Sequence, residues 1–251
     1  MAVLTSCTLT ACGAARGAER HSGVGSTEAA APSYGTTLNG PVPATILDAP
    51  LVDQAGRPTS LGSWHGKAIV LSDVMTLCQE TCPLATASMV SAAREIDRTP
   101  LGKNVEFVSL TIDPARDDLR HLRAYRHQFG ALPNWAVLRG SPQVVNAIWD
   151  RLGVWRHRTR LRPPYPTDWV TGQHLTTDIA HTDELILIDR DQRFRYEMEG
   201  AGNIRPGAIP ARIYRFMDAL GHRNAARPDV GSWSPSQVKT VIGWMLGRPT
   251  S

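Results

Sequence analysis

The sequence predicts an α/β fold in which helices flank a mixed sheet, and two features support this class. Short apolar runs rich in β-branched residues alternate with amphipathic segments between residues 68 and 152, as in parallel strands joined by helical crossovers. Two further apolar runs, at 184–189 and 194–198, flank a polar turn and predict an antiparallel hairpin near the end of the chain. An antiparallel hairpin added to parallel crossovers makes the sheet mixed.

The individual elements follow from turn residues and hydrophobic runs, in chain order. A small hairpin is expected over 44–61, because the Gly-Pro cluster at 54–58 separates two short apolar runs. Residues 68–72 and 105–112 are compact apolar runs typical of buried strands. The other predicted elements are a short strand at 135–138 and helices at 84–96, 119–129, 141–152, 210–220 and 235–246. This order is the thioredoxin-like arrangement.

Composition narrows the class of protein. The 251 residues are 42% hydrophobic and 20% charged, as in ordinary globular proteins. No run of about 18 apolar residues occurs, so no membrane-spanning helix is expected. The net charge is 27 − 23 = +4, and basic residues are scattered except at 156–162, which we expect to be a solvated loop. Nucleic acid is therefore not an expected partner.

The N-terminal region predicts export. Leu9-Thr-Ala-Cys12 resembles the lipobox of bacterial lipoprotein signal peptides, although the preceding apolar run is short and lacks a positive segment. The resemblance implies a signal peptide at 1–12, a lipidated Cys12 and a place on the extracytoplasmic face of the cell membrane. The alternative is a frayed terminus with incidental cysteines. Residues 13–42 are expected to be a disordered, flexible tether, because 18 of the first 25 are Gly, Ala, Ser, Thr or Pro. The folded domain is then expected over 43–251.

A cysteine pair is the main chemical feature of the domain. Cys78 and Cys82 are four residues apart and follow the predicted strand 68–72. Pro83 is expected at the first helical position, with Cys82 as the N-cap, where unpaired N–H groups favour a thiolate. Two such thiols can form a disulfide or bind a soft metal ion, and they can also be merely buried small side chains. Copper(I) suits two thiolates and an imidazole, whereas structural zinc normally needs four protein ligands.

Of the eight histidines, His181 is the candidate third ligand. It closely precedes the buried strand 184–189, and loops at strand ends are where a sheet of this type assembles its sites. His121 and His127 are expected on the solvated face of a helix, and His157 lies in the basic stretch. On position alone, His181 could be structural instead.

Four segments resemble the Sco/SenC family of thioredoxin-like copper proteins. They are Thr76-x-Cys78-x-x-x-Cys82-Pro83, Asp113-Pro114-Ala-Arg116-Asp117, Trp135-Ala-Val-Leu138-Arg-Gly140, and His181-Thr182 followed by Leu187-Ile-Asp189. The resemblance implies that Cys78, Cys82 and His181 bind copper. It also implies a role in assembling the binuclear copper centre of a respiratory cytochrome oxidase, whose copper-receiving subunit would be the partner.

The chain departs from the family pattern at three places near these residues. Gln79 stands where the family usually has proline, Met75 where it has an aromatic residue, and Ala180 where it often has Asp. These changes put the surroundings of the ligands in doubt. The pair Asp113 and Arg116 is expected to terminate a strand and cap a helix.

Three functions remain open on the sequence. A copper metallochaperone needs His181 beside the cysteines. A thiol–disulfide oxidoreductase needs Cys78 and Cys82 alone, although such enzymes normally use C-x-x-C. A peroxide-reducing enzyme would need a Thr and an Arg around one cysteine, and only Thr76 is identifiable.

Overall fold

A computed structural model describes residues 30–204, 207–226 and 233–248 of the chain. Its strands are β1 (Thr36–Pro41), β2 (Leu51–Asp53), β3 (Pro58–Thr59), β4 (Ala68–Val74), β5 (Val105–Thr111), β6 (Trp135–Arg139), β7 (Arg156–Arg160), β8 (Thr177–His181), β9 (Glu184–Ile188) and β10 (Arg193–Glu199). Its α-helices are α1 (Ala44–Leu47), α2 (Cys82–Asp97), α3 (Leu119–Phe129), α4 (Pro142–Arg151), α5 (Ala211–Phe216), α6 (Ala219–Ala226) and α7 (Pro235–Leu246). Short 3₁₀ helices cover η1 (Leu61–Trp64) and η2 (Gly102–Asn104).

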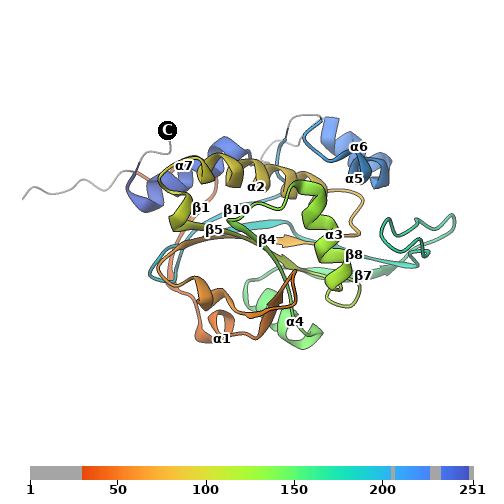
Figure 1. Cartoon of the computed structure of the whole chain (residues 1–251), viewed down its shortest axis with the longest axis horizontal. Helices are drawn as coiled ribbons and strands as arrows, with labels where there is room; N and C mark the ends of the chain where they lie inside the picture. The colour runs from red at the N-terminus through yellow and green to blue at the C-terminus, as the bar shows by residue number, and fades with distance from the viewer. Residues whose placement is uncertain (1–29, 205–206, 227–232, 249–251) are drawn as a thin grey trace, which may run out of the picture.

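One sheet forms the centre of the molecule, with the strand order β1-β10-β9-β4-β5-β6-β2-β3. Strands β4, β5 and β6 are parallel neighbours, and β9 joins β4 in the antiparallel direction. The expected thioredoxin-like mixed sheet flanked by helices is therefore confirmed (Figure 1).

The side chains of the central strands alternate between two apolar layers, because successive residues of a strand point to opposite faces. Val70 and Phe107 belong to the layer beneath α2, α3 and α7, whereas Leu71 and Val108 belong to the layer that includes α1 and α4 (Figure 1). All four are at most 1% exposed. Full burial of such a side chain contributes about 1.5–3 kcal/mol, so two complete layers hold β4 in a fixed position.

The predicted linker ends earlier than expected. Residues 36–41, assigned to the 13–42 tether, form β1 and pair with β10 at the edge of the sheet. Val42 is buried and its N–H donates to the Gln192 carbonyl at 2.9 Å. The boundary at residue 43 was therefore wrong. Residues 1–12, with Cys12, and the tether up to residue 29 lie outside the described residues.

Two other expectations fail in the second half of the chain. The basic stretch 156–162 was expected to be a loop, but its first five residues form β7, which pairs with β8. The helix expected over 210–220 is two helices, α5 and α6, because Met217 between them has an extended backbone. Within the part of the chain that the structure describes, no helix has the length and apolar character needed to cross a bilayer.

Candidate metal centre

Cys82 opens helix α2 directly after the loop that follows β4. The Thr81 carbonyl accepts the N–H groups of Leu84 and Ala85 at 2.9 and 3.1 Å, so Thr81 is the N-cap. Cys82 is therefore the first helical residue and Pro83 the second, one position from the expected assignment. Cys82 still lies at the positive end of a 16-residue helix.

Cys78 lies in the same loop, and the neighbouring Gln79 fixes that loop to the C-terminal helices. The Gln79 side chain donates to the Phe216 carbonyl at 2.7 Å, and its own carbonyl accepts the Asp218 N–H at 3.2 Å. The Gln79 carbonyl also packs against Gly221, where a Cβ would lie 2.0 Å from it. The departure from proline at this position thus gives the loop side-chain contacts that proline could not make.

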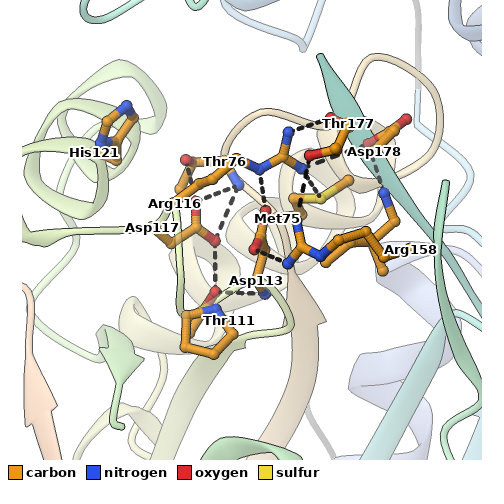
Figure 2. Close-up of polar contacts among 12 residues, drawn as sticks. Met75, Thr76, Thr111, Asp113, Arg116, Asp117, His121, Arg158, Thr177 and Asp178 are labelled. Atoms are coloured by element: carbon orange, nitrogen blue, oxygen red, sulfur yellow. Dashed lines mark hydrogen bonds and ion pairs between the residues drawn. The ribbon is translucent and has the colours of Figure 1, made fainter. Parts of the chain in front are cut away.

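Thr76 fixes the other end of the loop. Its N–H and hydroxyl both donate to the buried carboxylate of Asp117, the hydroxyl at 2.5 Å (Figure 2). The Thr111 hydroxyl donates to the second oxygen of Asp117 at 2.5 Å. Burial and then the negative charge of the nearby Asp113 raise the pKa of Asp117 to about 6, although the hydrogen bonds from Thr111 and Thr76 oppose this shift.

His181 reaches the cysteines from the end of β8. Its Nε2 lies 3.5 Å from the Sγ of Cys82, although 99 residues separate the two along the chain. Its Nδ1 lies 3.1 Å from the Thr182 carbonyl oxygen, and the side chain is 3% exposed. The structure therefore brings together Cys82 and the histidine that the sequence singled out.

Two carboxylates lie on the other side of the imidazole. Asp73 Oδ2 is 3.4 Å and Asp183 Oδ1 is 3.9 Å from His181 Nδ1. One donor atom from each of Asp73, Cys82, His181 and Asp183 lies within 4.8 Å of the others. Sequence reasoning missed both carboxylates. Asp73 sits inside a strand that is buried along its whole length, and a charged residue at such a position was the available signal.

The thiols and the imidazole shift one another's ionisation. Hydrogen bonding with Cys82 lowers the pKa of Cys78 well below its usual value, and His181 lowers it further against the effect of burial. The same hydrogen bond and burial raise the pKa of Cys82 well above its usual value. Burial opposes the charged form of His181, but Cys78 and the two carboxylates raise its pKa to about 10. The reduced centre thus favours a Cys78 thiolate beside an imidazolium.

Burial also raises the pKa of both carboxylates. Burial raises the pKa of Asp73, and the positive charge of His181 opposes this shift. Burial and then the negative charge of Asp73 raise the pKa of Asp183 to about 7. A cation in the centre would offset these costs, since metal binding competes with protons for such ligands.

Arg116 connects the cysteine loop to the strand that carries His181 (Figure 2). Its guanidinium pairs with the buried Asp113 and donates to the Met75 Sδ at 3.4 Å and to the Thr177 carbonyl on β8. Asp113 was expected to help cap a helix, but Asp118 caps α3 by accepting the His121 N–H at 2.9 Å. The capping part of that expectation was wrong.

His121 is not solvated, contrary to expectation. Its Nδ1 lies 2.7 Å from Asp118 Oδ1 and its Nε2 lies 3.0 Å from Asp168 Oδ2. The residue is only 5% exposed. Burial opposes its charged form, but the two carboxylates raise its pKa above the ordinary value. Helical periodicity could not reveal Asp168, which approaches from a loop 47 residues away.

The centre can support two kinds of chemistry. Cys78 and Cys82 are free thiols, 7% and 1% exposed, and oxidation can join them in a disulfide. As thiolates beside an imidazole, they match the ligands that soft metal ions prefer. Arg116 contacts Met75, three residues before Cys78, so an arginine does lie near the loop although the sequence did not identify one.

These features define a class of protein: a thioredoxin-like domain with a buried dithiol–imidazole centre where β4 meets α2. The chain belongs to the SCO1/SenC family, whose sequence model matches residues 46–217.

Individual relatives agree with this assignment over shorter segments. The chain is 29% identical over 98 residues to the mitochondrial protein SCO2 homolog of Mus musculus, covering 39% of this chain and 38% of that protein. It is 26% identical over 92 residues to the SCO1 protein homolog of Bacillus subtilis, covering 36% of this chain and 47% of that protein. The matches therefore span less than half the length of these relatives.

Solved structures share the fold. The crystal structure of Arabidopsis thaliana ScoI with copper bound superposes with a TM-score of 0.50 at 18% identity, covering 66% of this chain and 88% of that one.

Proposed function

We propose that this protein is a copper metallochaperone whose cargo is Cu(I), bound by Cys78, Cys82 and His181. The observation that carries the proposal is the 3.5 Å approach of His181 Nε2 to Cys82 Sγ, beside the buried Cys78, whose ionisation both residues shift. Thiolate and imidazole donors suit Cu(I). The family relationship supports the same cargo, since ScoI of Arabidopsis thaliana was solved with copper bound.

The redox state of the thiols controls binding in this proposal. A disulfide between Cys78 and Cys82 would remove both thiolates, so only the dithiol form holds copper. Binding also displaces protons, because the imidazolium of His181, with a pKa of about 10, must give up a proton to donate a lone pair. The affinity for Cu(I) therefore rises with pH through the neutral range.

The family relationship and the N-terminal motif support a proposal for the destination and location of the protein. The proposed recipient is the subunit of a respiratory cytochrome oxidase that holds the binuclear copper centre. A lipid on Cys12 would anchor the protein to the extracytoplasmic face of the membrane, with the following residues as tether.

Anaerobic titration of the reduced full chain with Cu(I), against a chromophoric chelator, tests the metal-binding claim. Cys7→Ser and Cys12→Ser remove the other thiols. We expect one tightly bound Cu(I), and a His181→Ala variant weaker by at least about tenfold, or about 1.4 kcal/mol. The exposed His65 provides a matched control, His65→Ala, which should bind as the parent does. Equal affinity in His181→Ala would contradict the ligand set.

A thiol–disulfide oxidoreductase is the second candidate, favoured by the opposite pKa shifts of the two thiols. A thiolate at Cys78 and a protonated Cys82 are the forms expected of an attacking and a resolving cysteine. Insulin reduction assays separate the candidates. The enzyme hypothesis predicts turnover that is reduced in His181→Ala, as the Cys78 pKa rises, but is abolished only when a cysteine is replaced, whereas the metallochaperone hypothesis predicts Cu(I) binding at least about tenfold weaker in His181→Ala.

A further inference from the structure

The imidazole of His181 lies between two different sets of donors. Its Nε2 faces the sulfur of Cys82, while its Nδ1 faces the oxygens of Asp73 and Asp183. The Cys82 Sγ nevertheless lies within 4.8 Å of one oxygen of each carboxylate. The centre therefore offers a second set of donor atoms: one sulfur, one nitrogen and two carboxylate oxygens in one compact group. The first set is that of Cys78, Cys82 and His181.

Asp73 is the residue that needs a further partner. It is 3% exposed, and its Oδ1 accepts the Glu184 N–H at 2.8 Å. Its Oδ2 is buried and accepts no hydrogen bond in the described residues, although it lies 3.4 Å from His181 Nδ1. The charged ring of His181 offsets part of the cost of burying this oxygen, and a metal ion would satisfy the oxygen directly when His181 gives up its proton to become a ligand.

Asp183 approaches the same point from the start of the next strand. Its side chain is 13% exposed, and its Oδ1 accepts a hydrogen bond from the Thr81 hydroxyl at 3.3 Å. Thr81 directly precedes Cys82, so this hydrogen bond ties the second carboxylate to the helix end that presents the thiol.

From this arrangement we infer a second metal-binding mode, in which Asp73, Cys82, His181 and Asp183 hold a divalent ion of the zinc class. Zinc accepts sulfur, nitrogen and carboxylate oxygen in four-coordinate sites, whereas Cu(I) prefers soft sulfur ligands to hard oxygen donors. Two carboxylates and a thiolate also balance a divalent charge better than a monovalent one.

This mode rests on the proposed function for its biological meaning, because both modes use Cys82 and His181. The two ions therefore exclude each other, and Cu(I) must displace the divalent ion to enter. Cys78 serves the Cu(I) mode alone, and the two carboxylates serve the divalent mode alone.

The test measures both ions on the same variants of the reduced full chain, with Cys7→Ser and Cys12→Ser in every protein. Zn²⁺ affinity is measured by competition with a chromophoric chelator, and Co²⁺ reports the coordination through its tetrahedral visible bands and its thiolate charge-transfer band. The variants are Asp73→Asn, Asp183→Asn and Cys78→Ser. Asp150→Asn is the matched control, since Asp150 is an exposed carboxylate paired with Arg156. Circular dichroism confirms folding, and two separate carboxylate variants keep the test decisive if one fails to fold.

The inference predicts a double dissociation. Asp73→Asn and Asp183→Asn should each weaken Zn²⁺ binding by at least about tenfold and abolish the tetrahedral Co²⁺ spectrum, while Cu(I) affinity does not fall. Cys78→Ser should retain Zn²⁺ and lose tight Cu(I) binding. A Zn²⁺ affinity that is unchanged in both carboxylate variants, or that is lost in Cys78→Ser, overturns the inference. A parent protein that binds Zn²⁺ in this pattern but not Cu(I) would instead overturn the proposed function.

Discussion

Arg116 donates a hydrogen bond to the carbonyl oxygen of Thr177 at 2.5 Å, and this contact joins the two halves of the metal centre (Figure 2). Thr177 begins the strand that ends at His181. The same guanidinium contacts the Met75 sulfur, three residues before Cys78. A methionine at 75, where the family usually has an aromatic residue, thus supplies an acceptor for this arginine.

Replacing Arg116 by lysine should loosen the centre. A lysine ammonium is a single point of charge and cannot bridge Met75, Asp113 and Thr177 together. We expect the Cu(I) dissociation constant to rise about tenfold, as for other residues that orient metal ligands. Competition titration measures this, with Arg120→Lys as control, since Arg120 makes an exposed contact to the Val170 carbonyl. An unchanged dissociation constant in Arg116→Lys would show that Arg116 does not orient the metal ligands.

The thiolate of Cys78 should depend on His181. In His181→Ala the hydrogen bond and positive charge that lower the pKa of Cys78 disappear, so this pKa should rise. The ultraviolet absorbance of the thiolate, followed through a pH titration of the reduced protein, measures the change. His65→Ala should titrate like the parent. A titration curve identical in all three proteins would show that His181 does not act on the thiol.

Gly221 should be intolerant of a side chain. A Cβ there would lie 2.0 Å from the Gln79 carbonyl oxygen, so Gly221→Ala must push the cysteine loop away from α6. We expect a loss of stability of about 1–3 kcal/mol, as for overpacking elsewhere, together with weaker Cu(I) binding. Chemical denaturation and metal titration measure the two effects.

Gly40→Ala is the matched control, because a Cβ at Gly40 meets no atom within 4 Å. If both alanine variants were equally stable, the close packing of Gly221 on Gln79 would be refuted.

Asp117 should make stability fall as pH rises through the acidic range. Its pKa is about 6 in the folded protein against 3.8 ordinarily, so the folded state binds this proton more tightly than the unfolded state. The resulting contribution is greatest below the ordinary pKa and is lost through about pH 6, by up to ~3 kcal/mol. Asp117→Asn cannot ionise and should lack this part of the slope. Urea unfolding of both proteins between about pH 4 and pH 7 tests it. Parallel pH profiles would be inconsistent with the shift.

The central fold was predictable because its strands are unusually apolar. The apolar runs at 68–72 and 105–112 predicted buried strands, and β4 contains all of the first run and β5 all of the second except residue 112. Strand β1 was missed because Thr36–Pro41 is mostly polar and four of its six residues are exposed, and it becomes a strand by pairing with β10. Strand β7 was missed for a similar reason, since four of its five residues are exposed and it becomes a strand by pairing with β8.

The candidate site was predictable in part. The spacing and position of Cys78 and Cys82 and the place of His181 before a strand are local features of the sequence. Asp73 and Arg116 act through contacts that span about 60 to 110 residues, which no local pattern encodes. Such long-range contacts arise only when the fold brings β4 of the central sheet, β8 of the two-stranded sheet and the segment before α3 together.

X-ray absorption spectroscopy of the Cu(I)-loaded full chain, with Cys7→Ser and Cys12→Ser, tests the central claim most directly. The account predicts a copper shell of two sulfurs and one imidazole nitrogen, with the nitrogen lost in His181→Ala and one sulfur lost in Cys78→Ser. A two-sulfur shell that is the same in the parent and in His181→Ala would contradict the account. The approach of His181 to Cys82 would then be a structural contact within a dithiol redox protein.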